Sequence, residues 1–177
     1  MIYTCTYQSK LGDILLASDE IGLIGLWFEG QKYFANTLPD EYITQENDIM
    51  KEAKKWLDIY FSGKEPDFIP PLHPYGSEFR QEVWKILLQI PYGQTTTYGE
   101  IARQMAKIRN VFRMSAQAVG GAVGHNEVSI IIPCHRVVGT NGSLTGYAGG
   151  IDKKVALLEL EHTNMKHFFV PKKGTAL

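Results

Sequence analysis

The first part of the chain alternates short apolar runs with polar turns. Residues 2–8, 14–18 and 21–28 each have the length and the β-branched or aromatic content of a strand. Apolar side chains then recur at helical spacing over residues 46–63, and Gly63 is the expected stop signal of that helix. The pattern predicts a small antiparallel α/β domain.

The pattern changes at a proline-rich segment. Residues 65–77 contain four prolines and a glycine, which indicates a linker or an extended connection. We therefore predict one domain over residues 1–72 and a second over residues 73–177.

Helical periodicity opens the second part. Residues 77–90 form an amphipathic pattern. Thr97 and Glu100 have the spacing of a capping box, which predicts the start of a second helix. Ser115 is expected to cap a third helix, which ends near Gly124.

Strand and turn signals follow these helices. The β-branched run at residues 128–132 has the length of a buried strand, and Pro133 is expected to mark its end. Asn141-Gly142 is a strong signal for a tight turn between two strands. Together with a closing helix over residues 151–162, the pattern predicts a helix-turn-helix with an appended hairpin or wing.

Net charge changes sign at the predicted boundary. Residues 1–72 carry six Lys and twelve acidic residues, a net charge of −6. Residues 73–177 carry twelve Lys or Arg and seven acidic residues, a net charge of +5. A basic half favours a polyanionic partner, and chance segregation of solvated charge explains the same counts equally well.

Two glycines stand in the middle of the predicted third helix, at Gly120 and Gly121. Each destabilises a helix interior by about 1 kcal/mol relative to alanine. Two explanations stay open. The glycines allow close packing on a neighbouring helix, or they allow the helix to approach another surface, such as a DNA groove, very closely.

Cysteine usage limits the chemistry. Two cysteines stand far apart, at positions 5 and 134, and form neither a disulfide framework nor a zinc-binding spacing. No segment has the pattern of a signal peptide or a membrane span. We expect a reduced, cytoplasmic protein without a metal or a cofactor.

The pair Cys134-His135 is the candidate reactive centre. A thiol is nucleophilic only as the thiolate, and its pKa falls near a histidine or another cationic group. From these two residues alone, a structural cysteine beside a satisfied histidine is the commoner case.

The surrounding motifs change that balance. The stretches TTYGEIA, AVGGAVGHN, IPCHRVVG and TGYAGG follow one another in this chain. In this order they resemble the signature of the O6-alkylguanine-DNA alkyltransferases, also called methylated-DNA–protein-cysteine methyltransferases. The resemblance covers about residues 77–165, and the N-terminal half is similar in layout only.

This resemblance implies the fold and the function. The fold would be α/β plus α, with a small antiparallel α/β (ribonuclease H-like) domain followed by a winged helix-turn-helix domain. The activity would be irreversible transfer of an alkyl group from O6-alkylguanine, and from O4-alkylthymine, to a thiol after base flipping. A monomer would act on double-stranded DNA, without a cofactor and away from membranes.

The resemblance also assigns the catalytic residues. Cys134 would accept the alkyl group, and His135 would act as its base through a bridging water. Glu161 would orient His135. Tyr98 would hydrogen-bond the flipped base, and Asn126 would tie the recognition helix to the active-site loop.

The same resemblance assigns the binding residues. The carbonyls of Cys134 and Val137 would accept from the guanine amino group, and the amide of Ala148 would lie near O6. Gln117 stands where the family commonly has an intercalating arginine, and we expect the loop arginines to compensate. The expected substrate- and DNA-binding residues are Gln117, Val137, Tyr147, Ala148, Gly149, Arg109, Arg113 and Arg136.

Three other functions fit parts of this pattern. A non-catalytic protein that recognises alkylated DNA would share the fold but would replace the acceptor cysteine. A Cys-His hydrolase would show multiple turnover. A plain helix-turn-helix regulator would bind DNA with Cys134 as a core residue.

Overall fold

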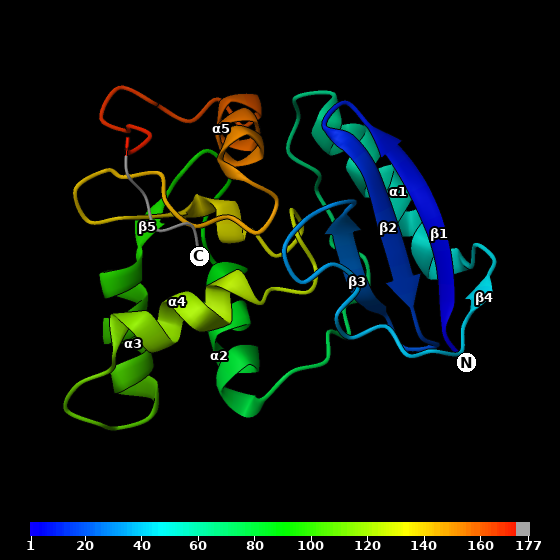
Figure 1. Ribbon diagram of the computed structural model, residues 1–177, viewed down its shortest axis with the longest axis horizontal. Helices are drawn as coiled ribbons and strands as arrows, with labels where there is room; N and C mark the ends of the chain where they lie inside the picture. Colours follow the sequence, from blue (N-terminus) through cyan, green and yellow to red (C-terminus); the bar gives the residue numbers. More distant parts are fainter. Residues whose placement is uncertain (173–177) are drawn as a thin grey trace. The chain divides into compact units, whose positions relative to one another are not determined.

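The computed structural model describes residues 1–172 of the chain, and these residues divide into two compact units. The first comprises Met1–Tyr75 together with Glu127–Ile131. The second comprises Gly76–Asn126 and the residues from Ile132 onward (Figure 1). The short segment Glu127–Ile131 thus belongs to the first unit, although it lies within the sequence of the second.

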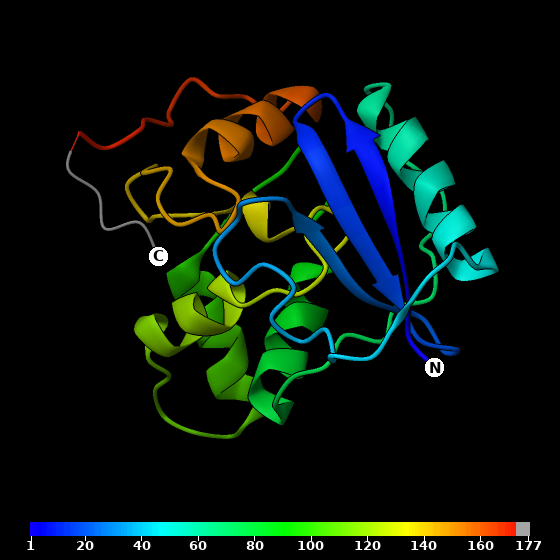
Figure 2. The ribbon, with the colours of Figure 1, turned by 45° about the vertical axis from the view of Figure 1, so that its right-hand side comes forward.

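A four-stranded sheet and one helix form the N-terminal unit (Figure 2). The strand order is β3-β2-β1-β4, with antiparallel pairing of β1 to β2 and of β2 to β3, and parallel pairing of β1 to β4. This confirms the predicted strands and helix. The elements are β1 (Tyr3–Ser9), β2 (Gly12–Ser18), β3 (Leu23–Phe28), β4 (Ile43–Thr44) and α1 (Asp48–Phe61).

The core of this unit lies on both sides of β3. Every residue of β3 is buried, as a strand covered on both faces requires. The helix α1 contributes Met50, Trp56 and Leu57 to the buried set. Gly63, with φ +88°, follows the helix, which confirms the predicted stop signal.

The proline-rich segment is an extended connection that pairs with the sheet. The amide of Leu23 donates to the carbonyl of Pro71 at 2.8 Å, and the amide of His73 donates to the carbonyl of Leu23 at 2.7 Å. The carboxylate of Asp19 then accepts from the Tyr75 hydroxyl at 2.7 Å and lies 2.5 Å from Nδ1 of His73. The segment is therefore fixed to the sheet as an additional extended strand-like piece.

The C-terminal unit is helical, with one short parallel strand pair. The indole of Trp84 on α2 (Glu78–Leu87) donates to the carbonyl of Ala122 on α4 (Ala116–Gly124) at 3.0 Å. This bond joins the two helices. The elements are α2 (Glu78–Leu87), β5 (Thr96–Thr97), α3 (Tyr98–Ile108), α4 (Ala116–Gly124), a 3₁₀ turn (Cys134–Arg136), β6 (Val137–Val138) and α5 (Ile151–Leu160).

The predicted helix caps are confirmed. The side chain of Thr97 accepts from the amide of Glu100, and that of Ser115 accepts from the amide of Ala118. The capping box at Thr97 is only half formed, because the carboxylate of Glu100 pairs with Arg103 instead of the cap amide.

The predicted strand at residues 128–132 is wrong. Val128 forms only an isolated bridge with Leu26, and the residues after it are in turns. Ile130 has φ +70°, which a strand does not allow. The run is apolar because it is buried, and burial alone does not specify an extended backbone.

The predicted hairpin after Cys134 is also wrong, although its turn is right. Gly142, with φ +88°, donates its amide to the carbonyl of Gly139 at 2.9 Å in the expected tight turn. However, β6 pairs in parallel with β5, and the returning chain pairs with Phe169 through the amide of Leu144.

Candidate active site

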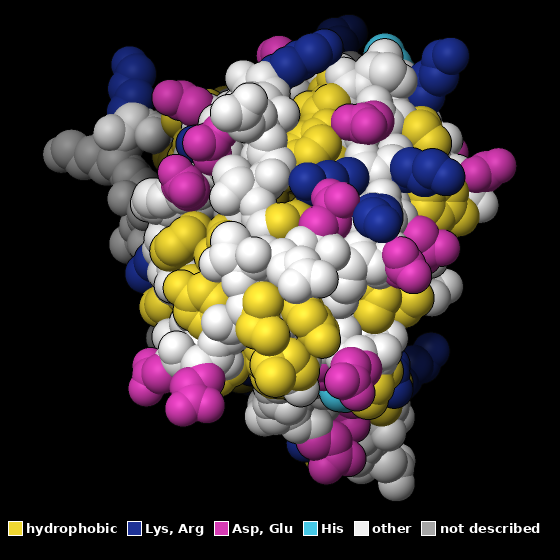
Figure 3. Space-filling model, turned by 90° about the vertical axis from the view of Figure 1, so that its right-hand side faces the viewer, with side chains coloured by type: hydrophobic (Ala, Val, Ile, Leu, Met, Phe, Trp, Pro, Cys, Tyr) yellow, Lys and Arg dark blue, Asp and Glu magenta, His cyan; other side chains and the backbone are white. Residues whose placement is uncertain are grey.

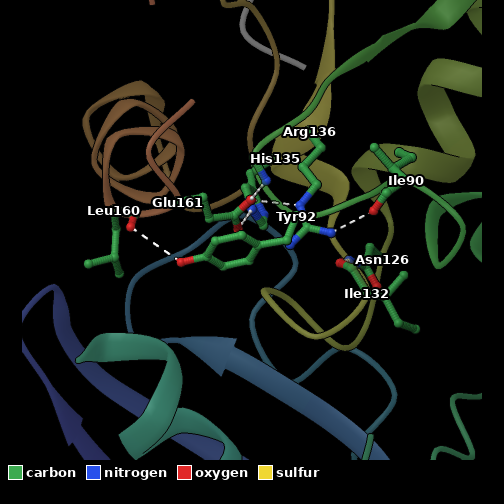
Figure 4. A network of polar contacts seen from close by, with 9 residues as sticks. Ile90, Tyr92, Asn126, Ile132, His135, Arg136, Leu160 and Glu161 are labelled. Atoms are coloured by element: carbon green, nitrogen blue, oxygen red, sulfur yellow. Dashed lines mark hydrogen bonds and ion pairs between the residues drawn. The ribbon is translucent and has the colours of Figure 1, made fainter. Parts of the chain in front are cut away.

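The candidate nucleophile lies in the 3₁₀ turn. The amide of Cys134 donates to the carbonyl of Ile132 at 2.8 Å, and the amide of Arg136 donates to that of Pro133 at 3.0 Å. The side-chain amide of Asn126, just after α4, also donates to the Ile132 carbonyl, at 2.7 Å (Figure 4). Asn126 thereby joins the end of α4 to the turn that carries Cys134.

The thiol of Cys134 is protonated at rest. Burial raises its pKa, while hydrogen bonding from the Asn126 side chain and the positive charge of Lys154 act in the opposite direction. Only 5% of the residue is exposed. A buried, protonated thiol needs a base before it can act as a nucleophile.

His135 and Glu161 form a fully buried pair. The Nε2 atom of His135 lies 2.5 Å from Oε2 of Glu161, and neither side chain is exposed (Figure 4). Burial acts to raise the pKa of the Glu161 carboxyl, but its interactions with His135 and Arg136 outweigh burial and hold this pKa at about 2. Glu161 is therefore ionised and can only accept a hydrogen bond.

This pairing sets the tautomer of His135. Since the carboxylate only accepts, Nε2 carries the proton. Burial lowers the pKa of His135, so the ring is neutral and Nδ1 keeps its lone pair. That nitrogen is buried and has no hydrogen-bond partner among residues 1–172. His135 is thus arranged as a base, with Glu161 ready to stabilise the imidazolium.

Arg136 holds the second oxygen of Glu161. Its Nε donates to Oε1 of Glu161 at 2.7 Å, and its Nη1 donates to the carbonyl of Ile90 at 2.7 Å. The guanidinium lies over the ring of Tyr92. Arg136 was expected to bind substrate or DNA, but it is buried and its Nε and Nη1 bond within the fold, so its position favours a role in orienting Glu161.

Tyr98 and Lys154 both hold the loop that follows the turn, and they share the carbonyl of Thr145. The hydroxyl of Tyr98 donates to the carbonyl of Thr145 at 3.3 Å. The ammonium of Lys154 donates to the carbonyls of Val137 and Thr145, at 2.6 and 3.0 Å. Burial raises the pKa of Tyr98 well above its usual range, and ionisation of Cys134 acts in the same direction.

Lys154 was missed in the sequence. Its side chain is completely buried, and burial lowers its pKa to about 8 although Cys134 acts to raise it. Lys154 precedes Leu157 and Leu158 by three and four residues, so it falls on the apolar side of α5. A lysine at a core position of an amphipathic helix was the available signal.

The structure brings the expected base-binding residues to the same loop. The Val137 carbonyl accepts from Lys154, and the Cys134 carbonyl accepts from the Val137 amide. Each carbonyl has a second lone pair for a ligand. The ring of Tyr147 is buried and meets the His135 ring edge to face, with 6.4 Å between centroids. Ala148 and Gly149 follow and are partly exposed.

The outer face of α4 has almost no side-chain bulk. Gln117, Ala118 and Gly121 are exposed, and a Cβ atom added at Gly121 would meet nothing within 4 Å. Gly120, by contrast, is buried. The two open explanations for the glycine pair therefore divide: Gly120 fits internal packing, and Gly121 fits close approach to an external surface.

The basic loop before α4 contains one paired and one free arginine. Arg109 donates to Glu82 on α2 at 2.8 Å, and its guanidinium lies over the ring of Phe79. Arg113 is exposed and forms no ion pair with any residue that the structure describes. Arg109 therefore anchors the loop, while Arg113 remains available to a phosphate.

Within residues 1–172, no three His, Cys, Asp or Glu side chains gather as metal ligands would. No helix in this part of the chain is both long and apolar enough to cross a bilayer.

Comparisons with known proteins show the family. Residues 2–74 match the model of the 6-O-methylguanine DNA methyltransferase ribonuclease-like domain, and residues 78–163 match that of its DNA binding domain. A methylated-DNA–protein-cysteine methyltransferase of Methanosarcina acetivorans is 44% identical over 161 residues, 90% of this chain and 98% of the relative.

Solved structures give the same result. The Mycobacterium tuberculosis O6-methylguanine methyltransferase has a TM-score of 0.76 at 40% identity, covering 98% of this chain and 97% of that one. A structure of the M. tuberculosis protein in complex with DNA has a TM-score of 0.77 at 42% identity, covering 90% and 92%. The predicted fold and resemblance are confirmed, and the chain belongs to the 6-O-methylguanine DNA methyltransferase family.

Proposed function

We propose that this protein repairs DNA by moving the alkyl group of O6-alkylguanine onto Cys134, once per molecule. The observation that carries the proposal is the buried thiol beside a buried His135–Glu161 pair. The pair supplies a base inside a site from which bulk water is excluded. We therefore expect the thiol to lose its proton within this site, when the substrate is bound there.

The chemistry needs no cofactor. Nδ1 of His135 takes the thiol proton, directly or through one water, and Glu161 stabilises the imidazolium. The sulfur lone pair forms a bond to the alkyl carbon while the bond between that carbon and O6 breaks. The Tyr98 hydroxyl donates a hydrogen bond that stabilises the departing guanine anion, and the proton held by the His135 imidazolium then neutralises this anion. The product is a thioether, which water does not hydrolyse, so the thiol is not regenerated.

The substrate must leave the base stack to reach this thiol, because the alkyl carbon lies inside the duplex. We propose that the small outer face of α4 enters the DNA groove and that Gln117 contacts the orphaned partner base. Arg113 holds a phosphate, which positions the protein without reading sequence. All these residues come from one chain, which supports action as a monomer, and the two free cysteines fit the reducing cytoplasm.

The α4 surface gives a test of DNA binding. Gly121→Ala is expected to preserve DNA affinity and to stabilise the protein by about 1 kcal/mol through helix propensity. Gly121→Leu adds a bulky side chain at a position where a Cβ atom meets nothing within 4 Å, and it is expected to weaken DNA binding about ten-fold or more. Equal affinities for the two variants in a fluorescence titration would contradict docking of this face.

The transfer itself is tested by intact-protein mass after reaction with excess duplex that carries one O6-methylguanine. We expect a gain of one methyl group, mapped to the peptide of Cys134, in the native protein and in Cys5→Ala. Cys134→Ala should gain none. Tight binding to the lesion without any gain would instead identify a recognition protein, and the roles of His135 and Glu161 would fall with the proposal.

A further inference from the structure

The loop between α3 and α4 presents apolar side chains to solvent. Ile108 is 57% exposed, Val111 45% and Phe112 104%. Large apolar side chains gathered at one exposed place commonly mark a binding surface. Phe112 is thus an aromatic ring without burial on either face, held at the tip of a loop.

The loop is tethered at its base and turned outward. Arg109 fixes it to α2 through Glu82 and the Phe79 ring. Asn110 has φ +52°, a turn conformation in which asparagine is enriched. Phe112 and Arg113 follow directly, so a fixed base presents a cationic and an aromatic side chain together.

The charge of this region favours a nucleic acid. Residues 101–126 contain Arg103, Lys107, Arg109 and Arg113 and no Asp or Glu. By contrast, the face drawn in Figure 3, on the side of β1 and α1, mixes acidic, basic and hydrophobic side chains. A basic stretch interrupted by an exposed aromatic ring is the composition of surfaces that bind DNA strands.

A hollow of about 710 Å³ lies beside the loop. Its floor is made of small residues of α3, including Ala102 and Ala106. Arg103, Phe112 and Arg113 line it, and it ends at Ser115 and Ala116, the start of α4. This volume is in the range of small-molecule sites, and the start of a helix favours a phosphate.

We propose that this hollow holds one nucleotide of the DNA strand beside the lesion, with its base or sugar against Phe112 and its phosphate at Arg113 and the start of α4. The inference rests on the proposed repair function, and commits to DNA because the hollow is continuous in sequence with the α4 face. The contact with Phe112 and Arg113 adds affinity for DNA. Gln117 brings no positive charge to the duplex at the position where the family commonly has an arginine.

The test measures binding of the lesion duplex to full-length Cys134→Ala protein at several salt concentrations. In this background, Phe112→Ala should weaken binding about five-fold or more, with an unchanged slope of log affinity against log salt. Phe112→Trp should bind like the parent. Arg113→Gln should weaken binding and reduce the slope by about one.

The matched control is Phe34→Ala, which removes a 40% exposed phenylalanine of the N-terminal unit. It should change neither the DNA affinity nor its salt dependence. With Cys134 present, Phe112→Ala should slow transfer from the duplex much more than transfer from the free base O6-benzylguanine. An affinity of Phe112→Ala equal to that of the control would overturn the inference while repair stands.

Two other results would also overturn it. Competition by free dGMP as strong as by duplex would mean a mononucleotide site, and equal slowing of both transfers with a lower melting temperature would mean a structural role. If the native protein accepts neither a methyl group from the duplex nor a benzyl group from the free base, the proposed function fails, and this inference with it.

Discussion

Each unit of the molecule contains a carboxylate–histidine pair, and only one of the two pairs is built for chemistry. In the N-terminal unit, Asp19 lies 2.5 Å from His73, and in the C-terminal unit Glu161 lies 2.5 Å from His135. In both, burial acts to raise the carboxyl pKa, and hydrogen bonds outweigh it and hold the pKa at about 2.

Burial of the histidine separates the two pairs. The His73 side chain is 41% exposed, so its ring is in contact with solvent, and the pair fixes the extended connection to the sheet. The His135 side chain is not exposed, and its second nitrogen is buried without a partner in the described part of the chain. A carboxylate–histidine contact of the same length therefore fixes a chain segment in one unit and, in our proposal, orients a base in the other.

The two cysteines repeat this contrast. Burial raises the pKa of both thiols, and in each case a lysine acts to lower it: Lys54 for Cys5 and Lys154 for Cys134. Lys54 is paired with Glu46 at 2.7 Å, so its charge is largely compensated. Lys154 is held by backbone carbonyls, which leave its full charge near the thiol.

The largest expected effect is on the two histidines. His135→Asn removes the base and should slow single-turnover methyl transfer about 100- to 10,000-fold, measured by rapid quench. His73→Asn should leave the transfer rate unchanged. Similar transfer rates for the two variants would contradict the assignment of a structural role to His73 and of the base to His135.

The two carboxylates should separate stability from chemistry. Glu161→Gln leaves the buried Arg136 charge without its partner and should lower the free energy of unfolding by about 3–5 kcal/mol, with loss of transfer. Asp19→Asn should lower it by about 1–3 kcal/mol with transfer retained. Urea unfolding and the quench assay check both, and loss of transfer in Asp19→Asn would contradict the contrast.

The same carboxylates set an acid limit to stability. Their pKa values of about 2 in the folded protein lie below the ordinary values of 3.8 for Asp19 and 4.5 for Glu161. Each therefore stabilises the fold above about pH 4.5, by about 2–3 kcal/mol, and this contribution is lost as the pH falls toward 2. Urea titrations at successive pH values should show the loss, with a smaller loss in Asp19→Asn.

The smallest effect concerns the lysines. Lys154→Met should raise the pKa of the Cys134 thiol and slow methyl transfer about ten-fold at neutral pH. Lys54→Met, beside Cys5, should not alter transfer. The pH profile of the transfer rate measures this shift, and an unchanged profile in Lys154→Met would show that the ammonium only holds the loop.

Local signals predicted the elements that depend on neighbouring residues in the sequence. Thr97 and Ser115 cap their helices because a side-chain oxygen accepts a hydrogen bond from the amide three residues later. Both partners lie within four consecutive residues, so the sequence alone predicts this contact. The motif around Cys134 predicted the pairing with Glu161 only through resemblance, because 26 residues separate His135 from Glu161.

Properties that depend on tertiary burial were not predictable in this way. Ile130 belongs to an apolar run that reads as a strand, yet it adopts φ +70° because packing decides its backbone. Arg136 was expected to contact DNA, and Lys154 was not singled out, yet the fold buries both. Charged residues on a core face are where sequence patterns mislead, since only the fold shows what compensates them.

The most direct test of the account is the stoichiometry of transfer. Increasing amounts of duplex with one O6-methylguanine are incubated to completion with a fixed amount of protein, and repaired guanine is counted. The account predicts a plateau at one repaired base per protein, unchanged by longer incubation or fresh duplex. Repair that continues beyond one base per protein would contradict it, because a thioether at Cys134 cannot turn over.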